Sequence, residues 1–386
     1  MSTLELLDRL IAFPSVSTDS NLGVVAFLED HLRELGFAVT RLTDATGQKA
    51  GLLARIGPEG DGGVLLSAHT DVVPVAGQAW SRDPFRLTRD GGRLYGRGTT
   101  DMKGFLASAL AAAGQAARTG LAQPFRLVLS WDEELGCLGI RSMIDRVIPV
   151  LGRPDFCIVG EPTRMQVATG HKGKVACLAT CRGMAGHSAM APKFLNALHL
   201  AADFIGILRA EQARLARVGA QDGDYDIACS TVHAGRMSGG LALNIVPDCA
   251  TVAFEIRHLA QEPAAAILAN IRAGADRIVA QAHHPAAAIE IAETNRYPGL
   301  ETPATAAVVD RVAALAGGAG RTKVAYGTEA GFFAALGIPT VVCGPGSMDQ
   351  GHQPDEFIET NQLAACDAML GALVAGLAGQ GSLRSF

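Results

Sequence analysis

Short apolar runs and Ala-rich amphipathic stretches alternate along the first part of the chain. Val64–Ser67 is a continuous apolar run typical of a buried strand, and Phe125–Ser130 and Asp155–Val159 read in the same way. Between the first two lies Phe105–Arg118, an Ala-rich stretch that predicts a long helix. Strands that alternate with helices in this way predict an α/β domain.

The rhythm changes at about residue 174 and returns after residue 292. The intervening segment predicts the order β-α-β-β-α-β, which is the ferredoxin-like split βαβ arrangement. We therefore expect a domain at 174–292 inserted into an α/β domain made of 1–173 and 293–386. The expected elements of the insertion are strand Val175–Arg182, helix Phe194–Arg217, strands Asp226–Arg236 and Thr251–His258, helix Glu262–Ala282 and strand Ala287–Ala292.

Two helix starts carry polar residues that could cap them. Asp19 and Ser20 precede an apolar stripe, and Gly36 stands where that helix should end. Asp101 precedes the Ala-rich helix and could serve as its N-cap, a role worth about 1 kcal/mol. A carboxylate at this point could instead be a metal ligand, and spacing alone favours the cap.

Composition and charge exclude several classes of protein. The 386 residues are 48% hydrophobic and 18% charged, which is typical of a compact folded chain. A net charge of -5 leaves no basic footprint for nucleic acid. There is no apolar run of membrane-spanning length, and Glu5, Asp8 and Arg9 do not fit a signal peptide. We expect a cytoplasmic protein.

The eight cysteines are scattered and form no C-x-x-C pair. In a chain of this length they are expected to be reduced core residues. A cysteine zinc site is therefore not expected, and any metal must be held by His, Asp and Glu.

His69 and Asp71 stand at the end of the first apolar run. Positions i and i+2 of an extended chain point the same way, so the two side chains can lie side by side. A carboxylate that orients a histidine is common around metal ions. The alternative is a histidine at a strand end beside a solvated aspartate.

Further acidic and histidine residues follow other predicted β-segments. Asp132, Glu133 and Glu134 follow one strand, Glu161 follows the next, and His352 follows a strand near the C-terminus. Ligand sites in α/β sheets lie outside the carboxyl ends of the strands. With His69 and Asp101, these residues supply a set of oxygen and nitrogen ligands that indicates a metal site.

The motifs resemble the dinuclear zinc family of aminoacylases, amino-acid deacetylases, desuccinylases and carboxypeptidase-G-like enzymes. The resemblance covers the whole chain and implies a zinc-exopeptidase-like catalytic domain, with a mixed central sheet flanked by helices, and an inserted lid and dimerisation domain. It rests on His69-Thr-Asp71, Gly-Arg-Gly-Thr-Thr-Asp101-Met-Lys-Gly, Glu133-Glu134, Gly-Glu161-Pro-Thr and Gly-His352-Gln-Pro-Asp-Glu.

The resemblance also implies a role for each of these residues. Two zinc ions per subunit, with cobalt as a possible substitute, would hold the water that attacks an amide. The peptide bond after the bridging aspartate, Asp101-Met102, would be cis. The implied roles are a bridging ligand in Asp101, one site completed by His69 and Glu161, the other by Glu134 and His352, an orienting carboxylate in Asp71 and a general base in Glu133.

The same resemblance implies substrate contacts. His187, in Gly-His-Ser-Ala, matches a histidine that donates to the oxyanion and commonly comes from the partner subunit of a homodimer formed through the inserted domain. The expectation from spacing alone is a surface histidine. Asn244 matches another residue that the partner subunit contributes to the site. Arg257 matches the residue that binds the substrate α-carboxylate, and Gly327 and Thr328 match a loop that also contacts that carboxylate.

Within the family the motifs most resemble the deacetylases that act on N²-acetyl-L-ornithine in arginine biosynthesis. Desuccinylases carry Arg-Arg-Gly before the insertion, whereas this chain has His171-Lys172-Gly173, which favours a small neutral acyl group. Other acyl amino acids remain open as substrates: N-acetylcitrulline, N-acetyllysine and N-succinyl-diaminopimelate. Two further alternatives are a dipeptidase and a non-catalytic binding protein of the same fold.

Overall fold

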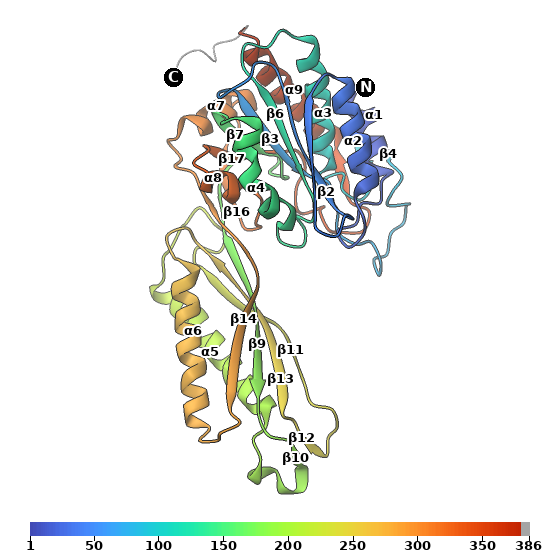
Figure 1. Cartoon of the computed structure of the whole chain (residues 1–386). Coiled ribbons are helices and arrows are strands. Elements are labelled where there is room, and N and C mark those ends of the chain that lie inside the picture. Colours follow the sequence, from blue (N-terminus) through green and yellow to red (C-terminus); the bar gives the residue numbers. More distant parts are fainter. Residues whose placement is uncertain (380–386) are drawn as a thin grey trace. The chain divides into compact units, whose positions relative to one another are not determined.

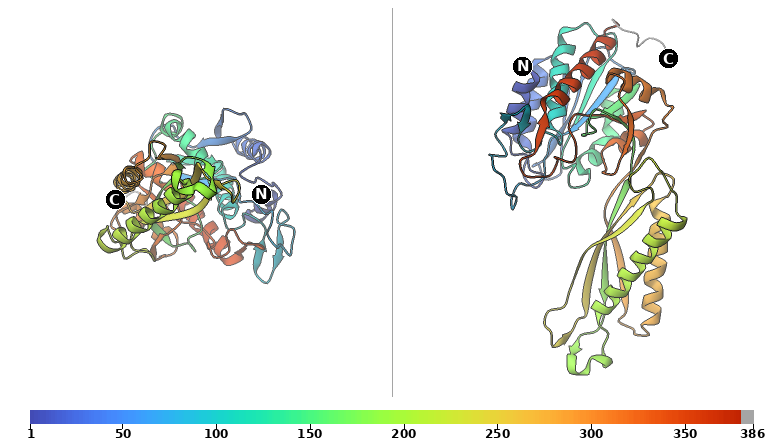
Figure 2. Two further views of the ribbon diagram at one scale, coloured as in Figure 1. Left: turned by 90° about the horizontal axis from the view of Figure 1, so that it is seen from below. Right: turned by 180° about the vertical axis from the view of Figure 1, so that it is seen from behind.

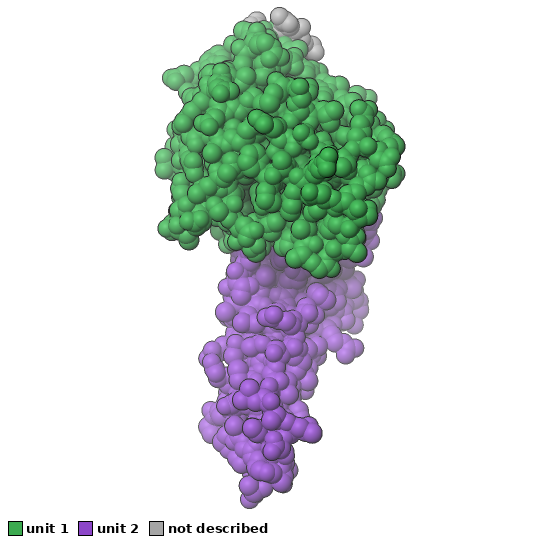
Figure 3. Space-filling model, turned by 90° about the vertical axis from the view of Figure 1, so that its right-hand side faces the viewer, with its two compact units in different colours: residues 1–170, 300–324, 328–386 green, residues 171–299, 325–327 purple. Residues whose placement is uncertain are grey.

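The structure is a computed structural model that describes residues 1–379. The chain divides into two compact units, which are coloured separately in Figure 3. Of the described residues, unit 1 contains 1–170, 300–324 and 328–379, and unit 2 contains 171–299 and 325–327. The predicted insertion, 174–292, falls inside unit 2. Within 1–379, no helix combines the length and apolarity needed to cross a membrane.

Unit 1 is built on a mixed sheet, as expected (Figure 1). Its central strands run parallel, and the outer pairs β1–β2, β2–β6 and β17–β8 are antiparallel. In sheet order the strands are β1 (Ala38–Thr43), β2 (Ala50–Ile56), β6 (Phe125–Ser130), β3 (Val64–His69), β7 (Phe156–Val159), β17 (Thr340–Val342), β8 (Val167–His171) and β15 (Leu300–Glu301), with β16 (Arg321–Val324) paired to β8.

Helices cover both faces of this sheet (Figure 2). One core cluster joins Leu52, Leu66 and Leu127 to five helices: α1 (Thr3–Ile11), α2 (Leu22–Glu34), α3 (Lys103–Arg118), α7 (Ala307–Leu315) and α9 (Thr360–Leu377). The neighbouring residues Leu53 and Val128 point to the opposite face, because successive side chains of a strand alternate, and they are buried as well. Both faces of the sheet are therefore covered. Helix α4 (Leu138–Leu151) packs against β2 and β6, and α8 (Ala330–Ala335) packs against β7 and β17.

A small antiparallel sheet lies beside the main one. It has the order β18-β5-β4 and joins the β4–β5 hairpin to a late strand. Its members are β4 (Thr88–Asp90), β5 (Arg93–Tyr95) and β18 (Phe357–Glu359). The pairing of β5 with β18 brings the loop before α3 next to the loop before β18.

Unit 2 has the strand order β11-β13-β9-β14, which is that of a ferredoxin-like βαββαβ domain. Alternate residues of β9 and β13 are buried, and they form one core with the two long helices. Its elements are β9 (Gly173–Arg182), β10 (Gly186–His187), a 3-10 helix (Ser188–Lys193), α5 (Ala197–Val218), β11 (Thr231–Gly239), β12 (Ile245–Val246), β13 (Cys249–His258), α6 (Ala264–Gln281) and β14 (Ala288–Tyr297).

Two helix starts differ from the sequence-based expectation. The second helix begins at Leu22 with Asn21 at its N-cap, and not with Asp19 or Ser20 as its cap. The Asn21 side chain instead bonds both backbone groups of Ala50 on β2. Helix α5 begins at Ala197, where the Asn196 side chain accepts from the Leu198 N–H. Pairing to a strand and side-chain capping thus overrode the apolar pattern at these boundaries.

Candidate metal centre

Three neighbouring parallel strands deliver most of the predicted ligands to one edge of the unit 1 sheet. His69 is the last residue of β3, Glu133 and Glu134 follow β6, and Glu161 follows β7. Strands β6 and β7 are the two parallel neighbours of β3. Because parallel strands end at the same edge, the loops that follow them converge there.

The two carboxylate oxygens of Asp101 face two different histidines. Oδ1 lies 3.1 Å from Nε2 of His69, which is also 3.6 Å from Oε1 of Glu161. Oδ2 lies 3.1 Å from Nε2 of His352, which is also 3.1 Å from Oε2 of Glu134. Asp101 therefore stands between two sets of potential ligands, with one histidine and one glutamate in each.

Two groups of side chains are close enough to hold an ion. Ligand atoms of His69, Asp101 and Glu134 lie within 4.8 Å of one another, and so do those of His69, Glu133 and Glu161. Carboxylate oxygens and imidazole nitrogens are ligands that divalent zinc accepts. Both groups use His69, so they cannot each hold an ion at once. The two sets around Asp101 have one histidine and one glutamate each, and that division of the ligands fits two divalent ions.

Asp71 connects His69 to the acidic loop. His69 Nδ1 lies 2.9 Å from the backbone carbonyl oxygen of Asp71 and 3.4 Å from its carboxylate. The same carboxylate accepts from the backbone N–H groups of Glu133, at 3.1 Å, and Glu134, at 3.3 Å, and from the Ser17 hydroxyl at 2.7 Å. A proton held on Nδ1 leaves Nε2 of His69 free to bind a metal.

Asp101 is not the cap of α3. The N-cap is Met102, no side chain caps the helix, and the Asp101-Met102 peptide bond is cis. The backbone N–H groups of Thr100 and Asp101 donate to Oε1 of Glu356 at 2.9 and 3.1 Å. The loop is thus held by a partner far along the chain, and the Asp101 carboxylate is left for the centre.

The ionisable groups of this centre have pKa values displaced from their usual ranges. Burial raises the pKa of Glu133 and of Glu161 well above the usual glutamate range. Burial and the Asp101 charge raise the pKa of Glu134 to about 7. Hydrogen bonds to Asp101 and Glu134 raise the pKa of His352 to about 10. Bound cations would supply positive charge to these closely spaced buried carboxylates.

Lys49 and the surroundings of Glu329 were missed by sequence reasoning. Lys49 neutralises Asp132 through an Nζ–Oδ1 contact of 2.6 Å, so the third acid of the loop faces a cation and not solvent. Glu329 is 1% exposed and accepts from the hydroxyls of Ser67 and Ser130, and burial raises its pKa to about 7. Glu329 directly follows Gly327 and Thr328, the two residues of this loop that were expected to contact the substrate, and that adjacency is the sequence signal for it.

Unit 2 carries two groups of predicted substrate residues. His187 and Asn244 are neighbours, since Ser188 N–H donates to the Asn244 carbonyl and β10 pairs with β12. The His187 Nδ1 accepts from the Ala189 N–H at 3.1 Å, which leaves Nε2 as the protonated nitrogen of the neutral ring. Both side chains are exposed.

Arg257 and Gly327 form the second group, around a residue that the sequence did not indicate. Arg257 donates to the Tyr297 hydroxyl at 2.5 Å and to Glu255 at 3.0 Å. Gly327 packs so closely on the same ring that a Cβ there would lie 2.2 Å from it. Thr328 belongs to unit 1 and is buried, and its hydroxyl accepts from the Ala330 N–H at the start of α8. Its role as a substrate contact stays a prediction.

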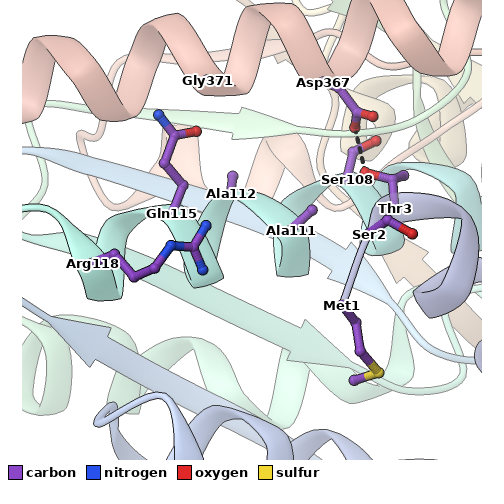
Figure 4. Close-up of a pocket in the computed structure, with 10 residues that line it drawn as sticks. All are labelled: Met1, Ser2, Thr3, Ser108, Ala111, Ala112, Gln115, Arg118, Asp367 and Gly371. Carbon is purple, nitrogen blue, oxygen red and sulfur yellow. Dashed lines mark hydrogen bonds between the residues drawn. The ribbon is translucent and has the colours of Figure 1, made fainter.

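A separate pocket of about 390 Å³ lies among α1, α3 and α9 (Figure 4). In it the Thr3 hydroxyl donates to the Asp367 carboxylate at 2.9 Å. Its lining residues include none of the predicted ligands or substrate contacts. This pocket is thus distinct from the candidate centre.

Comparison with known proteins gives the family. Residues 65–376 match peptidase family M20/M25/M40. Acetylornithine deacetylase from Pasteurella multocida (strain Pm70) is 36% identical over 388 residues, which cover 97% of this chain and 97% of that protein. The chain belongs to peptidase family M20/M25/M40. It is a metal-dependent hydrolase.

Several solved structures share the fold. A metallo-carboxypeptidase from Sulfolobus solfataricus has a TM-score of 0.79 at 19% identity and covers 98% of this chain and 99% of its own. A tripeptidase from Staphylococcus aureus also scores 0.79, at 20% identity, with 98% of each chain covered. A dinuclear metal-binding M20 peptidase from Bacillus subtilis scores 0.69 at 16% identity over 98% of each.

Proposed function

We propose that this chain hydrolyses the acetyl amide of N²-acetyl-L-ornithine to L-ornithine and acetate, with two zinc ions bound per chain and cobalt as a substitute. The observation that carries the hydrolytic centre is that the two oxygens of Asp101 face different histidines at 3.1 Å each. The named relative, at 36% identity over nearly the full length of both chains, supports the substrate.

The ligands divide between two sites. His69 and Glu161 would hold one ion, Glu134 and His352 the other, and Asp101 would bridge them. When bound, the ions lower the pKa of water toward neutrality and polarise the amide carbonyl.

Glu133 is proposed as the general base. It accepts from the Cys137 thiol at 3.3 Å, and Asp71 fixes its backbone next to His69. Burial raises the pKa of Glu133, which suits a group that first accepts a proton from water and then delivers it to the departing amine nitrogen. Asp71 would orient His69 throughout.

The exposed residues of unit 2 would complete the reaction. His187 would donate its Nε2 proton to the oxyanion, a contribution of roughly 3–4 kcal/mol for one preorganised donor. Its tautomer supports this role, because Nδ1 already accepts from the backbone. In this proposal unit 2 forms a homodimer, and His187 and Asn244 come from the partner subunit.

Arg257 would bind the substrate α-carboxylate, next to Gly327 and Thr328. Its contacts with Glu255 and the Tyr297 hydroxyl hold the guanidinium in place, and a planar fork suits a carboxylate.

Lys172 supports a small neutral acyl group. Its ammonium donates to the carbonyls of Ile227, at 2.7 Å, and Cys229, at 2.6 Å, and lies 5.4 Å from the centre of the Tyr225 ring. The side chain is 4% exposed. An amine engaged in this way is poorly placed to bind the distal carboxylate of a succinyl group. We therefore favour acetyl over succinyl. We also propose a cytoplasmic role in arginine biosynthesis.

A substrate panel tests the proposal. Metal-loaded protein should release acetate from N²-acetyl-L-ornithine with a higher kcat/KM than from N-acetylcitrulline or N-acetyllysine. N-succinyl-diaminopimelate and dipeptides, run in parallel, should be the poorest substrates. Each missing polar contact of a substrate group costs about 1–3 kcal/mol, or roughly 10- to 100-fold in rate.

Other outcomes would redirect the assignment. Preference for dipeptides would make the chain a dipeptidase with the same metal centre. Preference for the succinyl substrate would overturn the reading of Lys172. Tight metal binding without turnover of any of these compounds would indicate a non-catalytic relative.

A further inference from the structure

An ion pair with no role in the proposed chemistry lies close to the candidate metal centre. Arg97 and Glu356 are 0% and 1% exposed, and NH1 of Arg97 lies 2.6 Å from Oε2 of Glu356. Arg97 is four residues before Asp101, and Glu356 is four residues after His352. The pair therefore joins the two loops that carry these ligands.

Each partner bonds to the ligand loops as well as to the other. Oε1 of Glu356 accepts from the backbone N–H of Asp101 and of its neighbour Thr100. Arg97 NH1 donates to the carbonyl of Gln353, the residue after His352, at 3.2 Å. The pair thus holds the backbone at Asp101 itself, at Thr100 before it and at Gln353 after His352.

Gln78 extends the network to His352 itself. Its side-chain oxygen accepts from Arg97 NH2, and its Nε2 donates to the His352 carbonyl at 2.9 Å. The Trp80 ring covers the guanidinium at 4.9 Å. His352 has φ +62°, a left-handed conformation uncommon for a non-glycine residue. Such a conformation persists only where surrounding contacts hold it.

We propose that the Arg97–Glu356 pair positions the Asp101/Glu134/His352 metal site and sets the affinity of that site for its ion. A buried ion pair is weak evidence for stability, since an apolar pair of similar volume often serves as well. Here the other side-chain hydrogen bonds of the two partners go to the backbone of Gly98, Thr100, Asp101 and Gln353 and to the Gln78 side chain. The inference rests on the proposed dinuclear centre and not on the identity of the substrate.

The other site should depend on the pair much less. His69 is held by the β3 ladder and by Asp71, and Glu161 follows β7 in the same sheet. Only Asp101 is shared between the two sites. Loss of the pair should therefore weaken one ion more than the other, which a general loss of stability would not do.

The test is titration of the metal-free full chain with Zn²⁺ by calorimetry. His352→Asn and Glu161→Gln identify which binding step belongs to which site. We expect Arg97→Lys and Glu356→Gln to weaken the step that His352→Asn removes by about 10- to 100-fold, the usual effect of losing a group that orients a ligand. The step that Glu161→Gln removes should change by less than about threefold, within the ordinary context-dependence of a ligand's surroundings.

Arg126→Lys is the matched control. Arg126 is equally buried and donates to three backbone carbonyls, but it lies at the start of β6, the end opposite to Glu133. It should leave both binding steps unchanged. Gln78→Ala removes only the outer link to His352 and serves if Arg97→Lys does not fold, with a smaller but still selective loss expected.

Unchanged affinities, equal weakening of both steps, or the same loss in Arg126→Lys would overturn the proposal. Acetate release is measured separately. A wild-type protein that binds two ions but does not act on acetylornithine would refute the substrate and leave this inference standing. A wild-type protein that binds fewer than two ions would refute both.

Discussion

At the scale of single residues, two adjacent glutamates have different surroundings. Glu134 lies 3.1 Å from His352, while Glu133 accepts from the Cys137 thiol on the first turn after the loop. Both backbone N–H groups are bound by the one carboxylate of Asp71. A single buried aspartate thus fixes the spacing between the proposed base and the proposed ligand.

Glu133→Gln tests this division. The amide keeps the size of the side chain but cannot accept a proton, so kcat should fall by about 10²- to 10⁴-fold, the usual contribution of general-base catalysis. Zinc content, measured by atomic emission, should stay at the wild-type value. Because Glu133 also lies within ligand distance of His69 and Glu161, a lost ion would show that it is a ligand. Glu59→Gln, at an exposed position, is the control.

At the scale of elements, the centre depends on how closely strand β7 approaches helix α3. Gly160 lies between the last residue of β7 and Glu161, and a Cβ at this position would lie 2.0 Å from the Phe105 ring. Phe105 is on the first turn of α3, close after Asp101. The glycine thus allows a ligand from the sheet and a ligand from the helix loop to meet.

Gly160→Ala should separate these elements. Overpacking of this kind costs about 1–3 kcal/mol of stability, so the melting temperature of the metal-free protein should fall. Gly120→Ala is the matched control, since no atom lies within 4 Å of a Cβ there and its melting temperature should not fall. A melting temperature for Gly160→Ala equal to that of the control would show that the two elements can move apart without cost.

At the scale of the whole molecule, the residues assigned to the proposed site are divided between the two units. The metal ligands belong to unit 1, whereas His187, Asn244 and Arg257 belong to unit 2. In the proposed homodimer, His187 of one subunit serves the centre of the other. That arrangement makes a prediction about mixed dimers that no single-chain enzyme would meet.

Mixing two inactive variants tests it. Glu133→Ala and His187→Ala proteins are each expected to be nearly inactive, and subunit exchange should restore about a quarter of the wild-type activity at equal amounts. Half of the dimers are then mixed, and in a two-fold symmetric dimer each holds one centre with both residues intact. Two Glu133→Ala preparations mixed in the same way are the control. No recovery, in dimers shown to exchange, would place His187 in its own subunit's site or outside catalysis.

The sequence by itself determined the class of fold and the approximate place of the main strands and helices. Continuous apolar runs marked β3, β6 and β7, and the βαββαβ order of unit 2 followed from the alternation of its strands and helices. These features are local, because they depend on side chains a few residues apart. The ligand types and their positions after strands were also readable, since the carboxyl ends of parallel strands meet at one edge.

Only the tertiary structure decided how these residues are joined. By its spacing alone Asp101 looked more like a helix cap than a ligand. Its place between His69 and His352 depends on residues more than 30 and 250 positions away in the chain. The Arg97–Glu356 pair and the engaged ammonium of Lys172 depend in the same way on contacts made through the order of strands in a sheet. Such contacts leave no periodic trace in the sequence, because the partners are brought together by the packing of whole elements and not by their own neighbours.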